Sequence, residues 1–269
     1  MSCFKRWFPL VVVAVFFVQC EDRLDESVET QSTQDNSKMQ SEFDDINSTV
    51  ERYLNKELNQ GAKLAEDSCP VVTLNSATKR LVIDFGTSCM DAYGNERTGK
   101  IIADYTGGYK EAGSVITVAL EDYSVNGDQI TGTKTVTNQG TVNGFMQWKV
   151  EVSNAMITTS SGEEITWQST RYRALVESGQ ELNPYDQVYH IWGSASGIDR
   201  AERSFETTIA ETTPLVLDQE CWITTRLPIS GVIDITPEGL TKRSIDYGEG
   251  TCDRAVTLIV GNQSIELSL

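Results

Sequence analysis

FMQWKVEV, residues 145–152, decides the fold, because from Met146 onward its side chains alternate between apolar and polar character. The apolar face holds Met146, Trp148, Val150 and Val152. The polar face holds Gln147, Lys149 and Glu151. A period of two residues is typical of a β-strand that buries one side and exposes the other. Trp148 is therefore expected in the core rather than at a ligand site.

The same alternation recurs in residues 116–120 and 256–260. Turn dipeptides separate such segments: Gly94-Asn95, Asn126-Gly127, Asn143-Gly144, Ser161-Gly162, Glu238-Gly239 and Gly261-Asn262. Asn-Gly pairs tolerate the positive φ that tight hairpin turns require. We therefore predict an all-β body over residues 66–269, an antiparallel meander or sandwich of about fourteen strands.

A weak internal repeat runs through this body. TKRLVIDFGTSC (78–89) and TKRSIDYGEGTC (241–252) share Thr-Lys-Arg, then Ile-Asp-aromatic-Gly, then Cys. The repeat predicts two related units, about 66–175 and 186–269, one toward each end of the sheet. The alternative is chance recurrence of common strand and turn residues.

The segment before the β body predicts one amphipathic helix over residues 38–58. Its apolar residues recur at steps of four and three and are Met39, Phe43, Ile46, Val50 and Leu54. This spacing places them on a single helical stripe, which we expect to dock on the β body. A partner-binding helix is the alternative. Residues 20–37 are polar and acidic and predict a flexible tether, and no helix is expected after Leu58.

The N-terminus predicts export. Lys5 and Arg6 precede an apolar run, residues 7–18, that ends just before Cys20. The run is shorter than the roughly 20 residues that a membrane-spanning helix needs. We predict a signal peptide over residues 1–19, with Cys20 as the lipidated first residue of the mature chain. Phe17 and Gln19 stand where lipoprotein signals usually carry Leu and a small residue, so an ordinary secretory signal is the alternative.

Four further cysteines of the mature chain are candidates for disulfides: Cys69, Cys89, Cys221 and Cys252. An even number in an exported chain favours disulfides. Metal binding is disfavoured, because the chain has no Cys-x-x-Cys and a single histidine. Of the three connectivities that four cysteines allow, sequence order favours Cys69–Cys89 with Cys221–Cys252.

The chain is strongly acidic, with a formal net charge of −17. Loss of the signal removes Lys5 and Arg6 and no acidic residue, so the charge falls from −17 to −19. A surface this acidic repels nucleic acid, which is excluded as a main partner. The expected partners are the membrane, through the lipid anchor, and an envelope protein or a glycan.

Residues 69–138 resemble an uncharacterised family of exported lipoproteins of Bacteroidota. The resemblance rests on IDFGTSC, on GNERTGKI (94–101), on Tyr105-Thr106-Gly107, on Val125-Asn126-Gly127 and on Gly132-Thr133-Lys134. It implies attachment at the outer membrane or the cell surface. Glu21 and Asp22, directly after Cys20, resemble the surface-export signal of such proteins. The family implies no activity.

No catalytic set, metal site or cofactor is predicted. His190 lies in a segment predicted to be a strand, where a structural role is favoured. GSASG (193–197) has Ala195 where the nucleophile-elbow pattern has Ser. Asp84 and Asp246, equivalent in the repeat, are the best pair for carboxylate chemistry, although a structural role, ending a strand or bonding nearby backbone, is favoured. Oxygen ligands cluster in residues 91–96 without the spacing of a calcium loop.

Trp167, Arg171 and Arg173 are the candidate ligand-binding residues, because they lie in a strand of mixed polarity. An exposed aromatic ring in such a strand suits stacking on sugar rings, and core packing is the favoured alternative. We therefore expect a non-enzymatic, lipid-anchored envelope protein of structural, adhesive or ligand-binding type. A carboxylate-based glycan hydrolase and a lipid or glycan carrier are the alternatives.

Overall fold

The computed structural model describes residues 30–60, 69–91, 94–178 and 186–268. The predicted signal peptide, Cys20 and the predicted tether up to residue 29 lie outside these ranges. Within them, neither helix combines the length and the apolar character that a membrane span requires.

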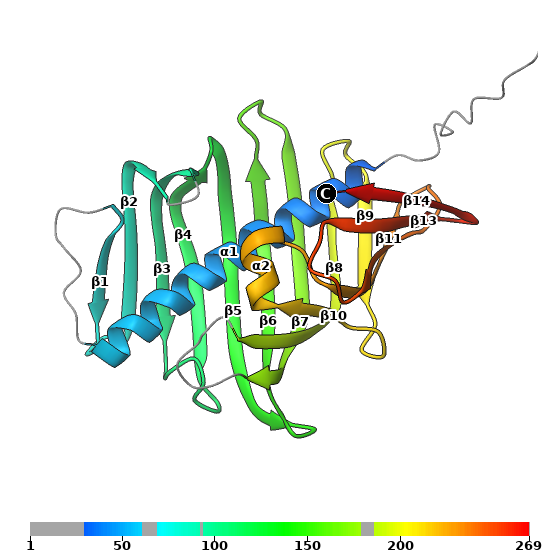
Figure 1. Cartoon of the computed structure of the whole chain (residues 1–269). Helices are drawn as coiled ribbons and strands as arrows, with labels where there is room; N and C mark the ends of the chain where they lie inside the picture. Colours follow the sequence, from blue (N-terminus) through cyan, green and yellow to red (C-terminus); the bar gives the residue numbers. More distant parts are fainter. Residues whose placement is uncertain (1–29, 61–68, 92–93, 179–185, 269) are drawn as a thin grey trace, which may run out of the picture.

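The described chain forms one antiparallel sheet, crossed on one face by a long helix (Figure 1). The first eight strands are β1 (Val71–Asn75), β2 (Arg80–Met90), β3 (Glu96–Tyr105), β4 (Val115–Val125), β5 (Asp128–Val142), β6 (Phe145–Thr158), β7 (Glu164–Ser178) and β8 (Gln187–Ile198). The remaining strands are β9 (Ser204–Ile209), β10 (Leu215–Asp218), β11 (Ser230–Pro237), β12 (Arg243–Glu249), β13 (Ala255–Val260) and β14 (Gln263–Ser268).

The sheet is a meander in which each strand pairs with its neighbour in sequence. β9 and β10 depart from this pattern, because they do not pair with each other. β9 pairs with the second part of β8, and β10 pairs with the first part. Both also pair with β11, so together they act as a single interrupted strand. The predicted all-β antiparallel meander of fourteen strands, preceded by one helix, is confirmed.

The tight turns follow from the predicted dipeptides, all of which lie between consecutive strands. Asn126 and Asn143 each have a φ of 51°, and the glycines after them have φ values of 85° and 90°. Positive φ at both central residues is the type I′ geometry that matches the twist of the flanking strands. These turns set the register of β4 with β5 and of β5 with β6.

The helix α1 (Gln31–Gln60) buries its apolar stripe against the sheet. All five stripe residues are at most 3% exposed: Met39, Phe43, Ile46, Val50 and Leu54. They join one hydrophobic core with inward-facing residues of β2 to β9 and Leu217 of β10. A second, smaller core lies among strands β9 to β13. β13 and β14 run across the direction of β1–β8 (Figure 1). The predicted stripe and its docking on the β body are therefore confirmed.

α1 begins at Gln31, so the prediction that residues 31–37 belong to a flexible tether is wrong. These residues are polar, but they find partners in the turn between β8 and β9. Ser32 donates a hydrogen bond to Asp199, and Asp35 forms an ion pair with Arg200. Hydrogen bonding to distant side chains offsets the cost of burying polar groups, which composition alone does not reveal.

A second helix, α2 (Gln219–Thr225), contradicts the expectation of no helix after Leu58. Asp218 caps it, because its side chain accepts hydrogen bonds from the backbone N–H groups of Glu220 and Cys221. An aspartate in this position satisfies donors that a helix N-terminus otherwise leaves open. The helix is too short for an apolar stripe to identify it.

The cysteines pair as predicted. Cys69 pairs with Cys89 and Cys221 with Cys252, at Cα–Cα distances of 5.6 and 5.4 Å. The first pair ties the start of β1 to the end of β2. The second ties α2 to the segment after β12, so each pair cross-links a region near one end of the sheet order.

The repeated Ile-Asp-aromatic-Gly motif forms the same local structure twice. The N–H of Gly86 donates to Asp84 at 2.8 Å, and the N–H of Gly248 donates to Asp246 at 2.9 Å. Both glycines have positive φ, and strand register shifts beside each. Both aspartates therefore shape a bulge, and they lie near opposite ends of the sheet order.

Truncation of the α1 stripe should destabilise the whole domain. Ile46→Ala removes a fully buried side chain and should lower the free energy of unfolding by about 2–5 kcal/mol. Ser41→Ala, on the exposed side of the same helix, should change it by less than about 0.5 kcal/mol. Urea unfolding followed by circular dichroism measures both. Equal effects of the two variants would show that α1 does not dock.

Candidate functional site

The face of the sheet that packs against α1, here called the inner face, carries three rows of cross-strand neighbours. The first row is Lys134, Val152, Ser169, Ala195 and Thr207. The second is Val136, Val150, Arg171, Gly193 and Ile209. The third is Asn138, Trp148, Arg173, Ile191 and Leu215. Three cationic side chains therefore lie among apolar ones on adjacent rows.

The three cationic side chains help to line a partly open hollow of about 60 Å³ between α1, α2 and the inner face, here called the inner pocket. The sheet supplies its floor, including the three cationic residues and Trp167. α1 supplies one side, with Gln40, Asp44 and Ser48 spaced four residues apart along one line of the helix. Trp222 of α2 supplies another side. α2 lies beside the middle of α1 (Figure 1).

Arg171 is the most unusual residue of the inner pocket. It is 6% exposed, and its Nη2 donates a hydrogen bond to Thr207 Oγ1 at 2.9 Å. Its Nε and Nη1 atoms are buried and reach no acceptor in the part of the chain that the structure describes. Burial lowers the pKa of Arg171 to about 10, and attraction to Asp44 only partly opposes that effect. The guanidinium thus lies in a site that disfavours its own charge.

Lys134 is a second buried cation beside it. It is 2% exposed, its Nζ donates to the Phe43 carbonyl oxygen at 2.7 Å, and Asp44 lies 3.6 Å away. Burial lowers the pKa of Lys134 to about 8, although Asp44 raises it in part. Lys134 therefore links the sheet to the backbone of α1 at the edge of the inner pocket.

Arg173 completes the cationic set. Its guanidinium lies 3.5 Å from the centre of the Tyr189 ring, in cation–π geometry. The carboxyl groups that act electrostatically on the three cations come from α1 and are those of Asp44 and Glu51. Burial raises the pKa of Glu51, which disfavours its negative form. The inner pocket consequently has more positive than negative charge, although the chain as a whole carries −17.

The structure brings the sequence-predicted residues Trp167, Arg171 and Arg173 together on one face of β7 and into one pocket. Trp167 is 4% exposed, stacks on Phe43 with ring centres 6.0 Å apart, and donates to Asn36 at 3.1 Å. It is thus both a core residue and part of the pocket wall. Cation–π or stacking contact with a ligand is limited to the part of its ring that faces the hollow.

Sequence reasoning missed Lys134 and Ser169. Lys134 stands in alternation with Ile130 and Val136, at a position that the period of two assigns to the core. A lysine at such a position is a detectable signal, because buried lysines are rare without a partner or a function. Ser169 lies between Trp167 and Arg171 on the same face of β7 and carries no comparable signal. The contributions of α1 and α2 depend on docking and are invisible in the sequence.

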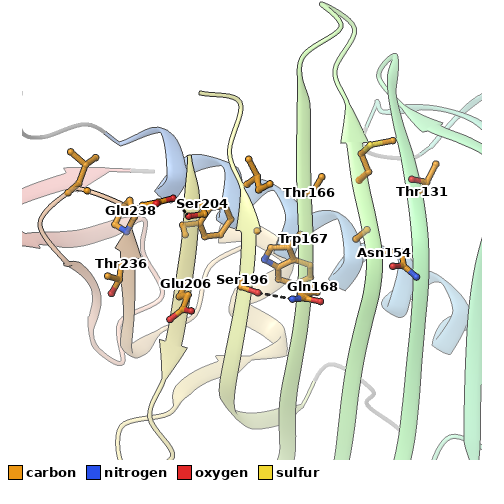
Figure 2. A pocket seen from close by; sticks show the side chains of 18 residues that line it. Thr131, Asn154, Thr166, Trp167, Gln168, Ser196, Ser204, Glu206, Thr236 and Glu238 are labelled. Carbon is orange, nitrogen blue, oxygen red and sulfur yellow. Dashed lines mark hydrogen bonds between the residues drawn. The ribbon is translucent and has the colours of Figure 1, made fainter. Parts of the chain in front are cut away.

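The outer face of the sheet, opposite α1, carries a wider hollow of about 920 Å³, here called the outer trough. Figure 2 shows its side chains arranged across neighbouring strands, with α1 behind them. Gln168, Ser196, Glu206 and Thr236 are successive cross-strand neighbours in it. Gln168 donates to Ser196 at 3.1 Å. The lining mixes exposed polar residues, to which water has access, with apolar residues such as Ile198 and Leu240.

Two carboxylates line the outer trough, Glu206 and Glu238. Both are exposed, and Glu238 accepts a hydrogen bond from Ser204. The acid in glycoside hydrolysis is normally shielded from water so that it keeps its proton. Neither residue has such a setting. The sequence-predicted pair, Asp84 and Asp246, is separated by most of the sheet.

The other sequence candidates have structural positions. His190 is half-buried within β8, and residues 193–197 also continue β8 instead of forming a strand-to-helix turn. Asp91 accepts hydrogen bonds from Asn95 and Arg97. Among the described residues, no group of three or more His, Cys, Asp or Glu side chains is arranged to hold a metal ion.

Comparison of the chain with protein-family models, with curated proteins and with solved structures finds no match. The geometry of the inner pocket therefore carries the functional argument by itself.

α1 also carries a carboxyl group that titrates near neutral pH. Burial raises the pKa of Glu42 to about 7, and the nearby Asp45 carboxylate adds to the effect. Lys38 and Arg97 act in the opposite direction, and Asp128 raises the pKa slightly. Glu42 lies on the part of α1 held by the ion pairs Lys38–Asp128 and Asp45–Arg97. Its charge state therefore affects the docking of α1.

The free energy of unfolding should fall as the pH rises through neutrality. Between about pH 4.5 and 7 the folded protein keeps a proton on Glu42 that the unfolded chain has released, so this group's stabilisation is present at low pH and lost above pH 7. Glu42→Gln should therefore be more stable than the natural protein at pH 8.5 by about 1–3 kcal/mol, and equal to it near pH 4.5. Urea unfolding at the two pH values measures the difference.

Glu164→Gln, at an exposed position, is the matched control and should show no such pH dependence. A Glu42→Gln effect of the same size at both pH values would contradict the raised pKa.

Proposed function

We propose that the protein is an exported, lipid-anchored envelope protein that binds a small ligand in the inner pocket. The observation that carries the proposal is a preformed hollow in which aromatic and cationic side chains converge beneath α1. Polar groups that converge on a concave, partly apolar surface are a usual feature of small-molecule sites. This hollow, at about 60 Å³, is smaller than most such sites and suits a small ligand or one end of a larger one. The proposed attachment, through Cys20 at the outer membrane or the cell surface, rests on the sequence.

Binding is better supported than the two alternatives. A lipid carrier needs an apolar hollow that accommodates acyl chains, whereas here the α1 stripe covers the apolar inner face. The space that remains is small and contains three cations. A carboxylate-based hydrolase needs two carboxyl groups at a shielded cleft, and the carboxylates of the outer trough are exposed. The inner pocket suits retention of a ligand.

The proposed anchor would hold the binding domain close to the membrane. Gln31, where α1 begins, lies eleven positions after Cys20. Fully extended chain spans at most about 3.6 Å per residue, so the domain would lie within about 40 Å of the lipidated residue. The intervening residues are acidic, and negative charge keeps a domain away from anionic lipid surfaces. A tethered binding module at short range is the arrangement that we propose.

Replacement of Cys20 should release the protein from the membrane. The natural chain, expressed in a bacterium with lipoprotein processing, should incorporate labelled palmitate and partition into the detergent phase. Cys20→Ser should lose the label and move to the aqueous phase, because stable anchoring needs the acyl chains. Cys3→Ser, within the predicted signal peptide, is the control and should leave both unchanged. If the Cys20→Ser protein still carries the label and stays in the detergent phase, Cys20 is not the lipid anchor.

Filling the inner pocket should abolish ligand binding. Val152 is 4% exposed and lines the pocket, so Val152→Phe places extra volume in the hollow. Saturation-transfer NMR with a panel of anionic, neutral and cationic small molecules should find binders of the natural protein that the variant loses. Gln168→Phe, in the outer trough, is the control and should keep them. If ligand binding is lost only in Gln168→Phe, the binding site lies in the outer trough and not in the inner pocket.

A further inference from the structure

Arg171 has hydrogen-bonding capacity that the described chain does not use. A guanidinium has five N–H donors, and the three on Nε and Nη1 reach no acceptor among the described residues. The side chain is 94% buried, since its exposed fraction is 6%, so bulk water does not compensate. A buried charge with one neutral hydrogen-bond partner is costly unless a further group accepts its remaining hydrogen bonds.

A second unsatisfied group lies next to it. Ser169 is 7% exposed, and its Oγ has no hydrogen-bond partner in the described part of the chain. Ser169 and Arg171 are two residues apart on β7, so both side chains face the inner pocket, which both line. Their unused donors therefore converge on the same small volume. A ligand atom that accepts hydrogen bonds would satisfy both.

Charge counting around the pocket gives the sign of that ligand. Lys134, Arg171 and Arg173 face two carboxyl groups, those of Asp44 and Glu51. Burial disfavours the negative form of Glu51, so the cations outnumber the negative groups and a negatively charged ligand is favoured. The hollow is small, so a planar carboxylate group fits it better than the bulkier tetrahedral phosphate or sulfate group.

The remaining lining residues indicate the chemical character of the rest of the ligand. Val150, Val152, Ile191 and Leu217 surround the charged groups with aliphatic surface, and Trp222 adds an aromatic wall. The hollow of about 60 Å³ holds about two water-sized groups, at roughly 30 Å³ each. This is room for a carboxylate group and the carbon atom next to it. The rest of the ligand would extend past Ser48 of α1, an exposed residue of the lining.

We infer that the inner pocket binds an aliphatic carboxylate, whose oxygens accept hydrogen bonds from Arg171 and Ser169 while its carbon atoms contact Val150, Val152 and Leu217. The inference rests on the proposed function and adds the chemical class of the ligand. A carboxylate offers about four acceptor sites and forms strong charge-assisted hydrogen bonds with a guanidinium. The carboxylate belongs either to a short free acid or to the end of a longer chain, and the two have the same chemistry at Arg171.

The test compares butyrate with its neutral isostere, butyramide. Isothermal titration calorimetry of the purified full-length protein in nonionic detergent, at constant ionic strength, should show one saturable butyrate site. Butyramide should bind at least tenfold more weakly. Octanoate separates the two sources: tighter binding than butyrate indicates the end of a longer chain, and weaker binding indicates a short free acid. Equal affinity for butyrate and butyramide overturns the inference, and this comparison needs no variant.

Variants then locate the carboxylate. Arg171→Gln should weaken butyrate binding at least tenfold, and Ser169→Ala about threefold. Arg80→Gln removes the same charge from an exposed position and should leave butyrate binding unchanged. If Arg171→Gln does not fold, Ser169→Ala remains as the test, since it removes one oxygen only. Butyrate affinity that is unaltered in the folded Arg171 or Ser169 variant overturns the assignment.

Stability separates a binding role of Arg171 from a structural one. In the absence of ligand, Arg171→Gln should unfold at the same temperature as the natural protein or higher, because it removes a poorly compensated buried charge. A lower unfolding temperature together with unchanged butyrate affinity would identify a structural residue. If only neutral or cationic probes bind, and Val152→Phe abolishes that binding, the proposed function stands and the inference of a carboxylate ligand is wrong. No probe binding at all would reject both.

Discussion

The burial of α1 against the inner face is the interaction on which the rest of the structure depends. Within the described residues, no second sheet lies in front of β2–β8, so the inward-facing residues of these strands need another partner. The apolar stripe of α1 supplies it and turns two amphipathic surfaces into one core. The ion pairs Asp35–Arg200 and Asp45–Arg97 lie on different turns of α1 and fix its direction across the strands.

The inner pocket forms where that coverage is incomplete. α1 is a narrow cylinder, and its polar flank, with Gln40, Asp44 and Ser48, does not fill the space beside Trp222 of α2. The inner-face positions beneath this gap hold Lys134 and Arg171 in place of the aliphatic residues that flank them. Polar residues thus occur where packing is least complete, and apolar residues where the stripe makes contact.

The sequence predicts those parts of the fold that depend on local patterns. Strand periodicity, Asn-Gly turns, the cysteine pairs and the α1 stripe all follow from neighbouring residues, and the structure has each of them. Residues 31–37 could not be assigned in this way, because their burial depends on Asp199 and Arg200, more than 160 positions away in the chain. α2 was missed because it is one short capped segment.

The candidate site was partly predictable for a geometric reason. Residues separated by two or four positions on one strand must share a face, so Trp167, Arg171 and Arg173 form a cluster once β7 is recognised as a strand. The sequence does not say which face of β7 is covered. Coverage determines whether the cations on that face are solvated or buried. α1 docks on the face that carries them, so a polar stripe that would be ordinary on a surface becomes a buried site with unused hydrogen-bond donors.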